Sequence, residues 1–293
     1  MLREVDIAIE PGELVALLGA SGSGKSTLLR LIAGLDRPTG GRIEIDGEPV
    51  RGIDPRCAVV FQEPRLLPWQ SLAANVQFGL APGTARSKGA AAVRHWLDVV
   101  GLREFGDHRP RQVSGGMAQR AGLARALARC PSVLLLDEPL ASLDALTRLR
   151  MQDLLDAVQQ EAGTTTVLVT HDVDEAVILA DRVLILRADT HPDSNGGAGI
   201  AAAFEIAIPK PRDRGDPRIT ALRDQLLDEL GVPRRSTAGL RSAIDEEVKA
   251  WRKVVTWQQF SLPLQSPRCR PAVPTRPLRR PRTFTWIMRT TTR

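Results

Sequence analysis

The sequence predicts an α/β fold with a largely parallel sheet, and three observations support that prediction. Short, nearly continuous apolar runs recur along the chain, as in Leu14–Leu18 and Ser132–Leu136. Segments with helical spacing separate these runs. A glycine-rich stretch, residues 19–27, joins the first run to a helical segment. This strand, loop, helix order is typical of a phosphate-binding loop.

The glycine-rich stretch fits the pattern G-x-x-x-x-G-K-[ST], followed by a second hydroxyl residue. Its members are Gly19, Ala20, Ser21, Gly22, Ser23, Gly24, Lys25, Ser26 and Thr27. Gly22 and Gly24 let backbone N–H groups turn inward, and the helix N-terminus that follows adds a partial positive charge. We therefore expect Lys25 to reach the β- and γ-phosphates of a nucleotide and Ser26 to ligate Mg²⁺.

Composition limits the class of protein. A chain of 293 residues with 43% hydrophobic content is long enough for one substantial core. No apolar stretch approaches the roughly 20 residues that span a bilayer, and the first residues lack a signal-peptide pattern. Cys57, Cys130 and Cys269 are isolated, which predicts neither a disulfide framework nor a zinc site. We expect a cytoplasmic protein with one main domain.

The first elements place an antiparallel β patch beside the nucleotide core. Glu4–Glu10 alternates apolar and polar residues and predicts a strand. Thr27–Ala33 predicts a helix that ends at Gly34. Arg42–Val50 contains Asp46-Gly47, which is a strong signal for a hairpin turn.

The middle of the chain predicts a strand and then a helical insertion. Cys57–Phe61 is a buried strand, and Gln62 follows at its carboxyl end, where open α/β sheets bind ligands. Taken alone, Gln62 is more often a simple strand exit than a functional residue. Helical spacing dominates residues 71–129. Within them Ser114, Gly115 and Gly116 precede a helix and indicate either a second anion site or only an N-cap.

Two later strands deliver polar side chains to the same edge of the sheet. Ser132–Leu136 ends at Asp137 and Glu138. In phosphate-loop proteins the first carboxylate holds Mg²⁺ through its water shell, and a second can polarise the attacking water. Thr164–Thr170 ends at His171, a candidate γ-phosphate partner, although a lone histidine is more often structural. Arg182–Arg187 predicts one further strand.

The C-terminal part divides in two. Residues 200–232 predict a β and helix extension of the main domain, whereas residues 233–293 are rich in Pro and Arg and predict a disordered tail. Residues 261–293 hold eight Arg and no acid, so the rest of the chain carries a net charge of −2. The tail could bind nucleic acid or anionic lipid. A solvated tail is favoured because aromatic residues do not interleave regularly with the arginines.

Taken in order, these motifs resemble the nucleotide-binding subunits of ABC transporters over residues 1–232. The resemblance identifies residues 19–27 as the Walker A loop and Gln62 as the Q-loop. It also gives the signature (Val113–Met117), Walker B (Val133–Glu138), the D-loop (Ser142–Asp144) and the switch His171. It implies a RecA-like P-loop core with a small, truncated antiparallel β patch and an α-helical insertion subdomain.

The resemblance also implies roles. Glu138 would be the general base, His171 would orient the γ-phosphate of ATP, and Lys25 would neutralise charge. Mg²⁺ would be managed by Ser26, Gln62 and Asp137. The remaining nucleotide contacts would come from the phosphate loop and from Ser114, Gly115, Gly116 and Asp144. The signature residues would complete the ATP site of a second copy, so that two chains form a head-to-tail homodimer.

Finer features resemble the importer group for nitrate, taurine and aliphatic sulfonates, most of all the aliphatic-sulfonate ATPases. These features include Leu66–Trp69, Asp144–Arg148 and Pro211–Arg214. The resemblance implies membrane permease partners, an indirect link to a periplasmic-type binding protein, and a peripheral position on the cytoplasmic face of the membrane. No nucleic acid is expected as a partner.

The start of the chain departs from the family pattern. The aromatic residue that stacks on adenine should lie upstream of Met1, and the chain contains no Tyr. We expect the strand that carries it to be absent, which would leave an unpaired sheet edge near Val5–Ile9. Two alternatives stay open: an ABC ATPase of DNA maintenance or ribosomes, and an inactive truncated gene product. Only 52 positions separate Gln62 from Ser114, too few for a long coiled-coil arm.

Overall fold

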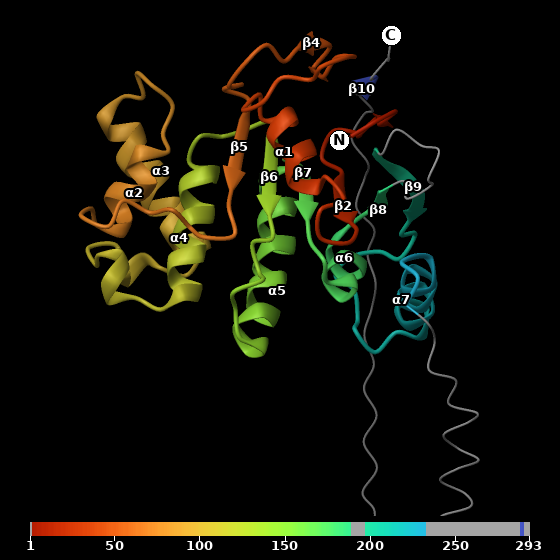
Figure 1. Ribbon diagram of the computed structural model, residues 1–293. Coiled ribbons are helices and arrows are strands. Elements are labelled where there is room, and N and C mark those ends of the chain that lie inside the picture. Colours follow the sequence, from red (N-terminus) through yellow and green to blue (C-terminus); the bar gives the residue numbers. More distant parts are fainter. Residues whose placement is uncertain (1, 189–196, 233–287, 290–293) are drawn as a thin grey trace, which may run out of the picture. The chain divides into compact units, whose positions relative to one another are not determined.

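The computed structural model describes residues 2–188, 197–232 and 288–289. A six-stranded sheet runs through its centre in the order β5-β6-β7-β2-β8-β9 (Figure 1). The first five strands in this order are parallel, and only β9 is antiparallel to its neighbour. The strands are β2 (Leu14–Leu18), β5 (Cys57–Val60), β6 (Val133–Asp137), β7 (Thr165–Val169), β8 (Arg182–Ala188) and β9 (Ala198–Glu205). The α/β prediction is confirmed.

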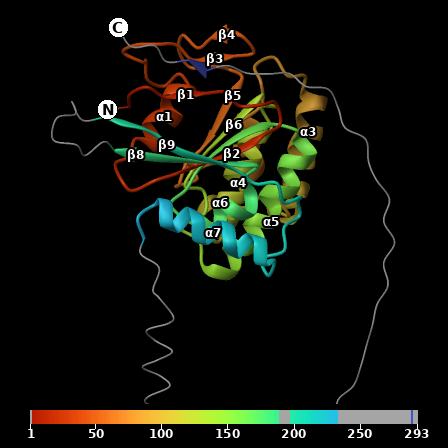
Figure 2. The same ribbon diagram turned by 90° about the vertical axis from the view of Figure 1, so that its right-hand side faces the viewer.

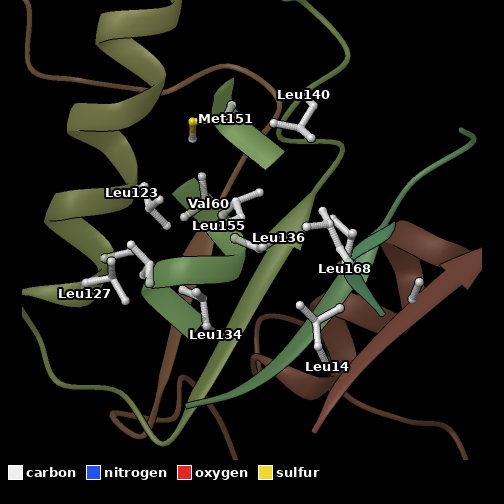
Figure 3. Close-up of a cluster of buried hydrophobic side chains, with 14 of the residues drawn as sticks. Leu14, Val60, Leu123, Leu127, Leu134, Leu136, Leu140, Met151, Leu155 and Leu168 are labelled. Atoms are coloured by element: carbon white, nitrogen blue, oxygen red, sulfur yellow. The ribbon is translucent and has the colours of Figure 1, made fainter. Parts of the chain in front are cut away.

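Helices cover both faces of the sheet, which explains why β2 is apolar at every position (Figures 1 and 2). Successive side chains of a strand point to opposite faces. Val15 and Leu17 pack in the cluster that contains α1 (Lys25–Ile32). Leu14, Ala16 and Leu18 pack in the cluster on the other face. That face is covered by α5 (Ala145–Ala162) and α6 (Val173–Leu179), and Figure 3 shows part of its core.

The helical insertion forms as predicted within residues 71–129. It contains α2 (Leu72–Phe78), α3 (Arg86–Val99) and α4 (Gly115–Leu127), with two short 3-10 helices, Arg103–Phe105 and Pro110–Gln112, between α3 and α4. In Figure 1 these helices lie beyond the β5 edge of the sheet. Leu123 and Leu127 of α4 are buried in the same core cluster as Leu134 and Leu136 of β6, so the insertion is anchored to the sheet through α4.

Of the two antiparallel elements predicted, the hairpin forms as expected and the N-terminal strand differs from the prediction. β3 (Glu44–Ile45) and β4 (Glu48–Pro49) form the expected hairpin, with Asp46 and Gly47 at positive φ of 54° and 72°. β1 (Asp6–Ile7) is shorter than expected and pairs antiparallel with β10 (Met288–Arg289).

The β1–β10 pairing overturns two expectations at these residues. The edge predicted to be unpaired near Val5–Ile9 has a partner at Asp6 and Ile7, and the tail predicted to be disordered contributes a strand at Met288 and Arg289. The physical reason is that unpaired backbone N–H and C=O groups of an edge accept any extended segment that reaches them. Residues 233–287 and 290–293 lie outside the described part, so the rest of the tail prediction stays a prediction.

The C-terminal extension consists of β9 and α7 (Pro217–Glu229). The loop before α7 carries Arg212, whose side chain is buried and donates to the carbonyl oxygens of Ile208 at 2.9 Å and Val177 at 2.9 Å. The bond to Val177 satisfies a carbonyl group near the end of α6. Across the described residues, no helix is both long enough and apolar enough to cross a membrane.

Candidate functional site

The candidate site lies where the parallel strands end. The carboxyl ends of neighbouring parallel strands meet at the same edge of a sheet, and β7 lies between β2 and β6 in this one. The phosphate loop follows β2, Asp137 ends β6, and His171 follows β7. Gln62 follows β5 and is exposed to solvent. The topology thus brings the predicted site residues of four strands to one edge.

The phosphate loop has the backbone of an anion cradle. Gly22 and Gly24 have positive φ values of 83° and 92°, a conformation that disfavours a side chain. Gly24 is the N-cap of α1, and no side chain caps the first N–H groups of this helix. The buried Oγ of Ser23 also has no hydrogen-bond partner. Free donors around a loop at a helix N-terminus fit a bound phosphate chain.

Lys25 lies inside this loop. Its Nζ donates to the carbonyl oxygens of Gly19 at 2.8 Å and Ala20 at 3.0 Å, and only 6% of the residue is exposed. Burial lowers the pKa of Lys25, while the nearby carboxylates of Glu138 and Asp137 act in the opposite direction. The ammonium group is therefore held at the mouth of the loop, where it can neutralise phosphate charge.

A hydroxyl and a carboxylate meet at the start of α1. Ser26 Oγ donates to Oδ1 of Asp137 at 3.1 Å. Burial raises the pKa of the Asp137 carboxyl, and the hydrogen bond from Ser26 opposes that rise. This donor set suits Mg²⁺, which prefers oxygen ligands and usually keeps several waters or phosphate oxygens. Nowhere in the described part do three or more His, Cys, Asp or Glu side chains form a metal cluster.

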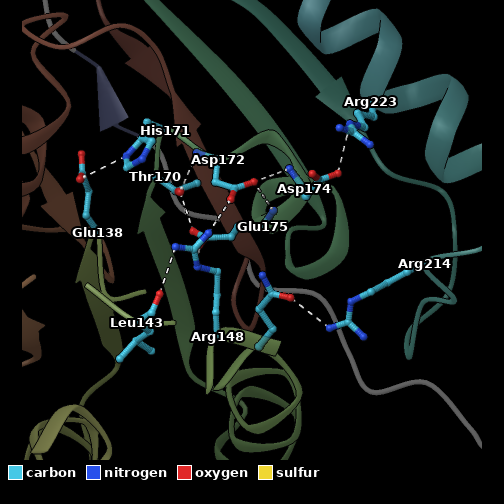
Figure 4. Close-up of polar contacts among 11 residues, drawn as sticks. Glu138, Leu143, Arg148, Thr170, His171, Asp172, Asp174, Glu175, Arg214 and Arg223 are labelled. Carbon is cyan, nitrogen blue, oxygen red and sulfur yellow. Dashed lines mark hydrogen bonds and ion pairs between the residues drawn. The ribbon is translucent and has the colours of Figure 1, made fainter. Parts of the chain in front are cut away.

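Glu138 and His171 form the second polar pair. The Nδ1 of His171 lies 3.3 Å from Oε2 of Glu138 (Figure 4). Glu138 has a positive φ of 46°, and its backbone N–H donates to the carbonyl oxygen of Val169 at 2.9 Å. This turn after β6 directs the Glu138 side chain toward the end of β7. The pair remains open to solvent, with 26% of the Glu138 side chain and 63% of the His171 side chain exposed.

The signature residues lie at a different place in the chain. Ser114 caps α4 by accepting from the N–H of Met117 at 3.3 Å, and Asp144 caps α5 by accepting from Thr147 at 3.0 Å. These bonds to Thr147 lower the pKa of Asp144. A Cβ atom on Gly116 would lie 2.5 Å from Cγ2 of Thr147, and its other near neighbour is Leu143. Gly116 therefore contacts the start of α5 rather than the phosphate loop of its own chain.

Two pockets accompany these groups. One of about 450 Å³ opens beside the phosphate loop, where Gly22, Gly24 and Thr27 face Leu2 and Arg3. The other, of about 430 Å³, lies at the N-terminus of α4; its lining includes Ser114, Gly116, Met117, Arg120 and Arg150. Sequence reasoning identified the glycines of both pockets but not the apolar wall that Leu2 contributes to the first.

Sequence reasoning also missed three polar residues near His171. Glu175 contacts both Arg148 and Thr170, and Asp172 contacts the same two residues (Figure 4). A local signal was present, since Asp172-x-x-Glu175 before an apolar run has the form of a capping box. Nothing in the sequence linked that signal to Arg148.

The fold and the site together define a phosphate-loop nucleotide-binding protein. The sequence profile described as "ABC transporter" matches residues 2–141. Aliphatic sulfonates import ATP-binding protein SsuB 1 of Xanthomonas axonopodis pv. citri (strain 306) is 49% identical over 73% of this chain and 83% of its own length. Aliphatic sulfonates import ATP-binding protein SsuB of Granulibacter bethesdensis (strain ATCC BAA-1260 / CGDNIH1) is 50% identical over 79% of this chain and 89% of its own.

Solved structures of similar fold agree with the family that the sequence relatives indicate. The ATP-binding cassette MJ0796, in a dimeric post-hydrolysis state bound to ADP and Pi, shares 32% identity and a TM-score of 0.59 over 71% of this chain and 91% of that one. The chain cbiO1 from Clostridium perfringens, at 24% identity and a TM-score of 0.64 over 82% of this chain and 92% of that one, shares the fold. The chain belongs to the ABC transporter family, as an ATP-binding subunit with ATPase activity.

Proposed function

We propose that this chain energises an ABC importer of aliphatic sulfonates or related anions such as taurine and nitrate. The observation that carries the hydrolytic part is the convergence of Lys25, the Ser26–Asp137 pair and the Glu138–His171 pair at one sheet edge. The substrate class rests on the names of relatives that are about half identical in sequence.

The residues divide the work of hydrolysis. The N–H groups of residues 19–27 and the ammonium group of Lys25 hold the phosphates. Ser26, Asp137 and Gln62 would hold Mg²⁺, which when bound would neutralise charge on the phosphate oxygens. Glu138 accepts the proton of the attacking water as general base. His171, in contact with Glu138, keeps that carboxylate in place and orients the γ-phosphate.

The assembly follows from the separation of the signature from the phosphate loop. Ser114, Gly115, Gly116 and Asp144 complete the site of a second copy, so that two ATP molecules lie in one head-to-tail homodimer. The dimeric state of the solved cassette MJ0796 supports this arrangement. Permease subunits in the membrane bind this dimer, which places it at the cytoplasmic face, and a periplasmic-type binding protein acts indirectly through the permease.

Glu138→Gln tests the assignment of the general base. Glutamine has nearly the same shape but cannot take the proton, so we expect turnover to fall by at least about 100-fold. ATP binding should stay within a few-fold because the phosphate loop is unchanged.

Glu161→Gln is the matched control, because Glu161 also contacts a histidine, His95, at 3.6 Å but on an exposed surface. That variant should keep normal turnover. Normal turnover of Glu138→Gln would show that another group is the base.

A further inference from the structure

Arg148 lies at the centre of a polar cluster behind the Glu138–His171 pair (Figure 4). Its Nη2 donates to the carbonyl oxygen of Leu143 at 3.2 Å, and its Nη1 to Oδ2 of Asp172 at 3.4 Å. Its Nε lies 3.8 Å from Oε1 of Glu175. One guanidinium group therefore contacts the loop before α5 and the first turn of α6 at once.

The acceptors on the α6 side are fixed by further bonds. The side chain of Glu175 is only 4% exposed, and its Oε2 accepts from the hydroxyl of Thr170 at 2.6 Å. The same hydroxyl accepts from the N–H of Asp172 at 3.0 Å. Asp172 in turn caps α6 through its other oxygen, which accepts from Asp174 at 2.8 Å. His171 lies between Thr170 and Asp172 and is therefore held on both sides.

The arrangement departs from an ordinary capping box. In that motif the third residue of the helix accepts from the N–H of the N-cap. Here Thr170 accepts from that N–H, and the carboxylate of Glu175 is buried against Thr170 and Arg148 instead. Burying a carboxylate is costly unless it is paired. Arg148 of α5 supplies the opposite charge, with its Nε 3.8 Å from this carboxylate.

We propose that Arg148 is a positioning residue for ATP hydrolysis, which ties the loop between Glu138 and α5 to the start of α6 and so holds His171 against Glu138. Two contacts join the same two segments of the chain. Glu138 contacts His171, and Arg148 contacts both Leu143, which follows Glu138, and Asp172, which follows His171. The proposal rests on the proposed roles of Glu138 and His171.

The shape of the guanidinium explains why an arginine is required. Its N–H groups diverge in a fixed plane and reach acceptors in several directions, whereas the ammonium group of a lysine is a single point of charge. Arg148→Lys keeps the charge and most of the stem but cannot contact Leu143, Asp172 and Glu175 together. The substitution therefore tests geometry rather than charge.

Steady-state ATP hydrolysis by the full chain with Mg²⁺ is the main measurement. We expect Arg148→Lys to lower kcat at least tenfold and to leave the KM for ATP within threefold, because the phosphate loop is untouched. Arg214→Lys is the matched control, since Arg214 also contacts α5, through Gln152 at 3.0 Å and Asp153 at 3.1 Å, but on the surface. It should leave both constants unchanged. A kcat of Arg148→Lys within twofold of the parent chain would overturn the proposal.

The imidazole of His171 provides a readout of position. The chain contains four histidines, so the signals of their rings can be separated by nuclear magnetic resonance and assigned to His171 with His171→Gln. Arg148→Lys should shift or broaden the His171 signals, and Arg214→Lys should not. Unchanged His171 signals in a variant that has lost activity would show that Arg148 acts in another way.

Glu175→Gln separates positioning from stability and serves in place of Arg148→Lys if that variant does not fold. Glutamine can still accept from Thr170 but carries no charge for Arg148. Burial raises the pKa of Glu175, so its ionised form opposes folding above that pKa, and the amide should unfold at an equal or higher temperature at pH 8. We nevertheless expect kcat to fall at least fivefold.

The double variant Arg148→Lys/Glu175→Gln should be no slower than the slower single variant, because both remove the same link. Independent, multiplying losses would overturn the proposal. Failure of the proposed function is distinguishable, since it would appear as normal turnover in Glu138→Gln whatever the Arg148 variants do.

Discussion

At the scale of single residues, burial shifts the proton affinity of the groups that face the phosphate loop. Burial lowers the pKa of Lys25 and raises the pKa of Asp137, and each partner moderates the shift of the other. A bound phosphate chain would favour the charged form of Lys25, and bound Mg²⁺ would favour the charged form of Asp137.

Cys57 shows the same effect away from the site and yields a prediction. Burial raises its pKa to about 12, and its Sγ–H contacts the carbonyl oxygen of Ile32 at 3.6 Å. Since the thiolate is the nucleophile, Cys57 should stay unreactive well below that pH. Cys130 is exposed. Alkylation with iodoacetamide at pH 8, read by peptide mass spectrometry, should label Cys130 in the folded chain and Cys57 only after unfolding. Equal labelling of both would contradict the burial of Cys57.

At the scale of helices, the close packing of α4 against α5 depends on one glycine. Gly116 is the second residue of α4. Thr147 of α5 lies so close to it that it occupies the space a side chain at position 116 would need. Asp144 fixes the same turn of α5 by capping it. The signature and the D-loop are thus joined in one packed unit, so a change in one is expected to move the other.

A matched pair of alanine variants tests this packing. Gly116→Ala places a methyl group 2.5 Å from Thr147 and should lower the free energy of unfolding by about 1–3 kcal/mol. Gly115→Ala meets nothing within 4 Å and should change it by less than about 0.5 kcal/mol. Urea denaturation of both variants gives the comparison. Equal stability of the two would mean that the helices separate freely at this point.

At the scale of the whole molecule, the proposed dimer would use two separate regions of each chain. The phosphate loop with its carboxylates lies at the sheet edge, and the signature lies on the helical insertion beside its own α5. A head-to-tail pair of chains would bring the two regions together twice, and its symmetry would make both ATP sites equivalent.

ATP-dependent dimerisation is the corresponding prediction. Glu138→Gln should sediment as a monomer without nucleotide and as a dimer with ATP and Mg²⁺, because hydrolysis no longer removes the ligand that joins the halves. Lys25→Ala, which weakens the hold on the phosphates, should stay monomeric under the same conditions. A Glu138→Gln chain that binds ATP and still sediments as a monomer would refute the arrangement.

The sequence by itself determined the features that depend on neighbouring residues. The strand, loop, helix order around Gly19–Thr27, the Asp46-Gly47 hairpin and the carboxylates at the end of β6 all form where the pattern predicted them. Such features follow from backbone conformation and from the alternation of apolar residues, which act over a few positions. The order of the motifs along the chain was then enough to identify the protein family.

Only the tertiary structure decided the contacts between distant segments. Arg148 meets Asp172 across 24 positions, β1 pairs with β10 near the other end of the chain, and Leu2 forms a wall beside Gly24. No local pattern specifies these partners, because each contact exists only once the sheet has placed two separate segments side by side. The sequence predicted which side chains lie at the carboxyl ends of the strands. The fold determined which other residues, such as Arg148, contact the segments that carry them.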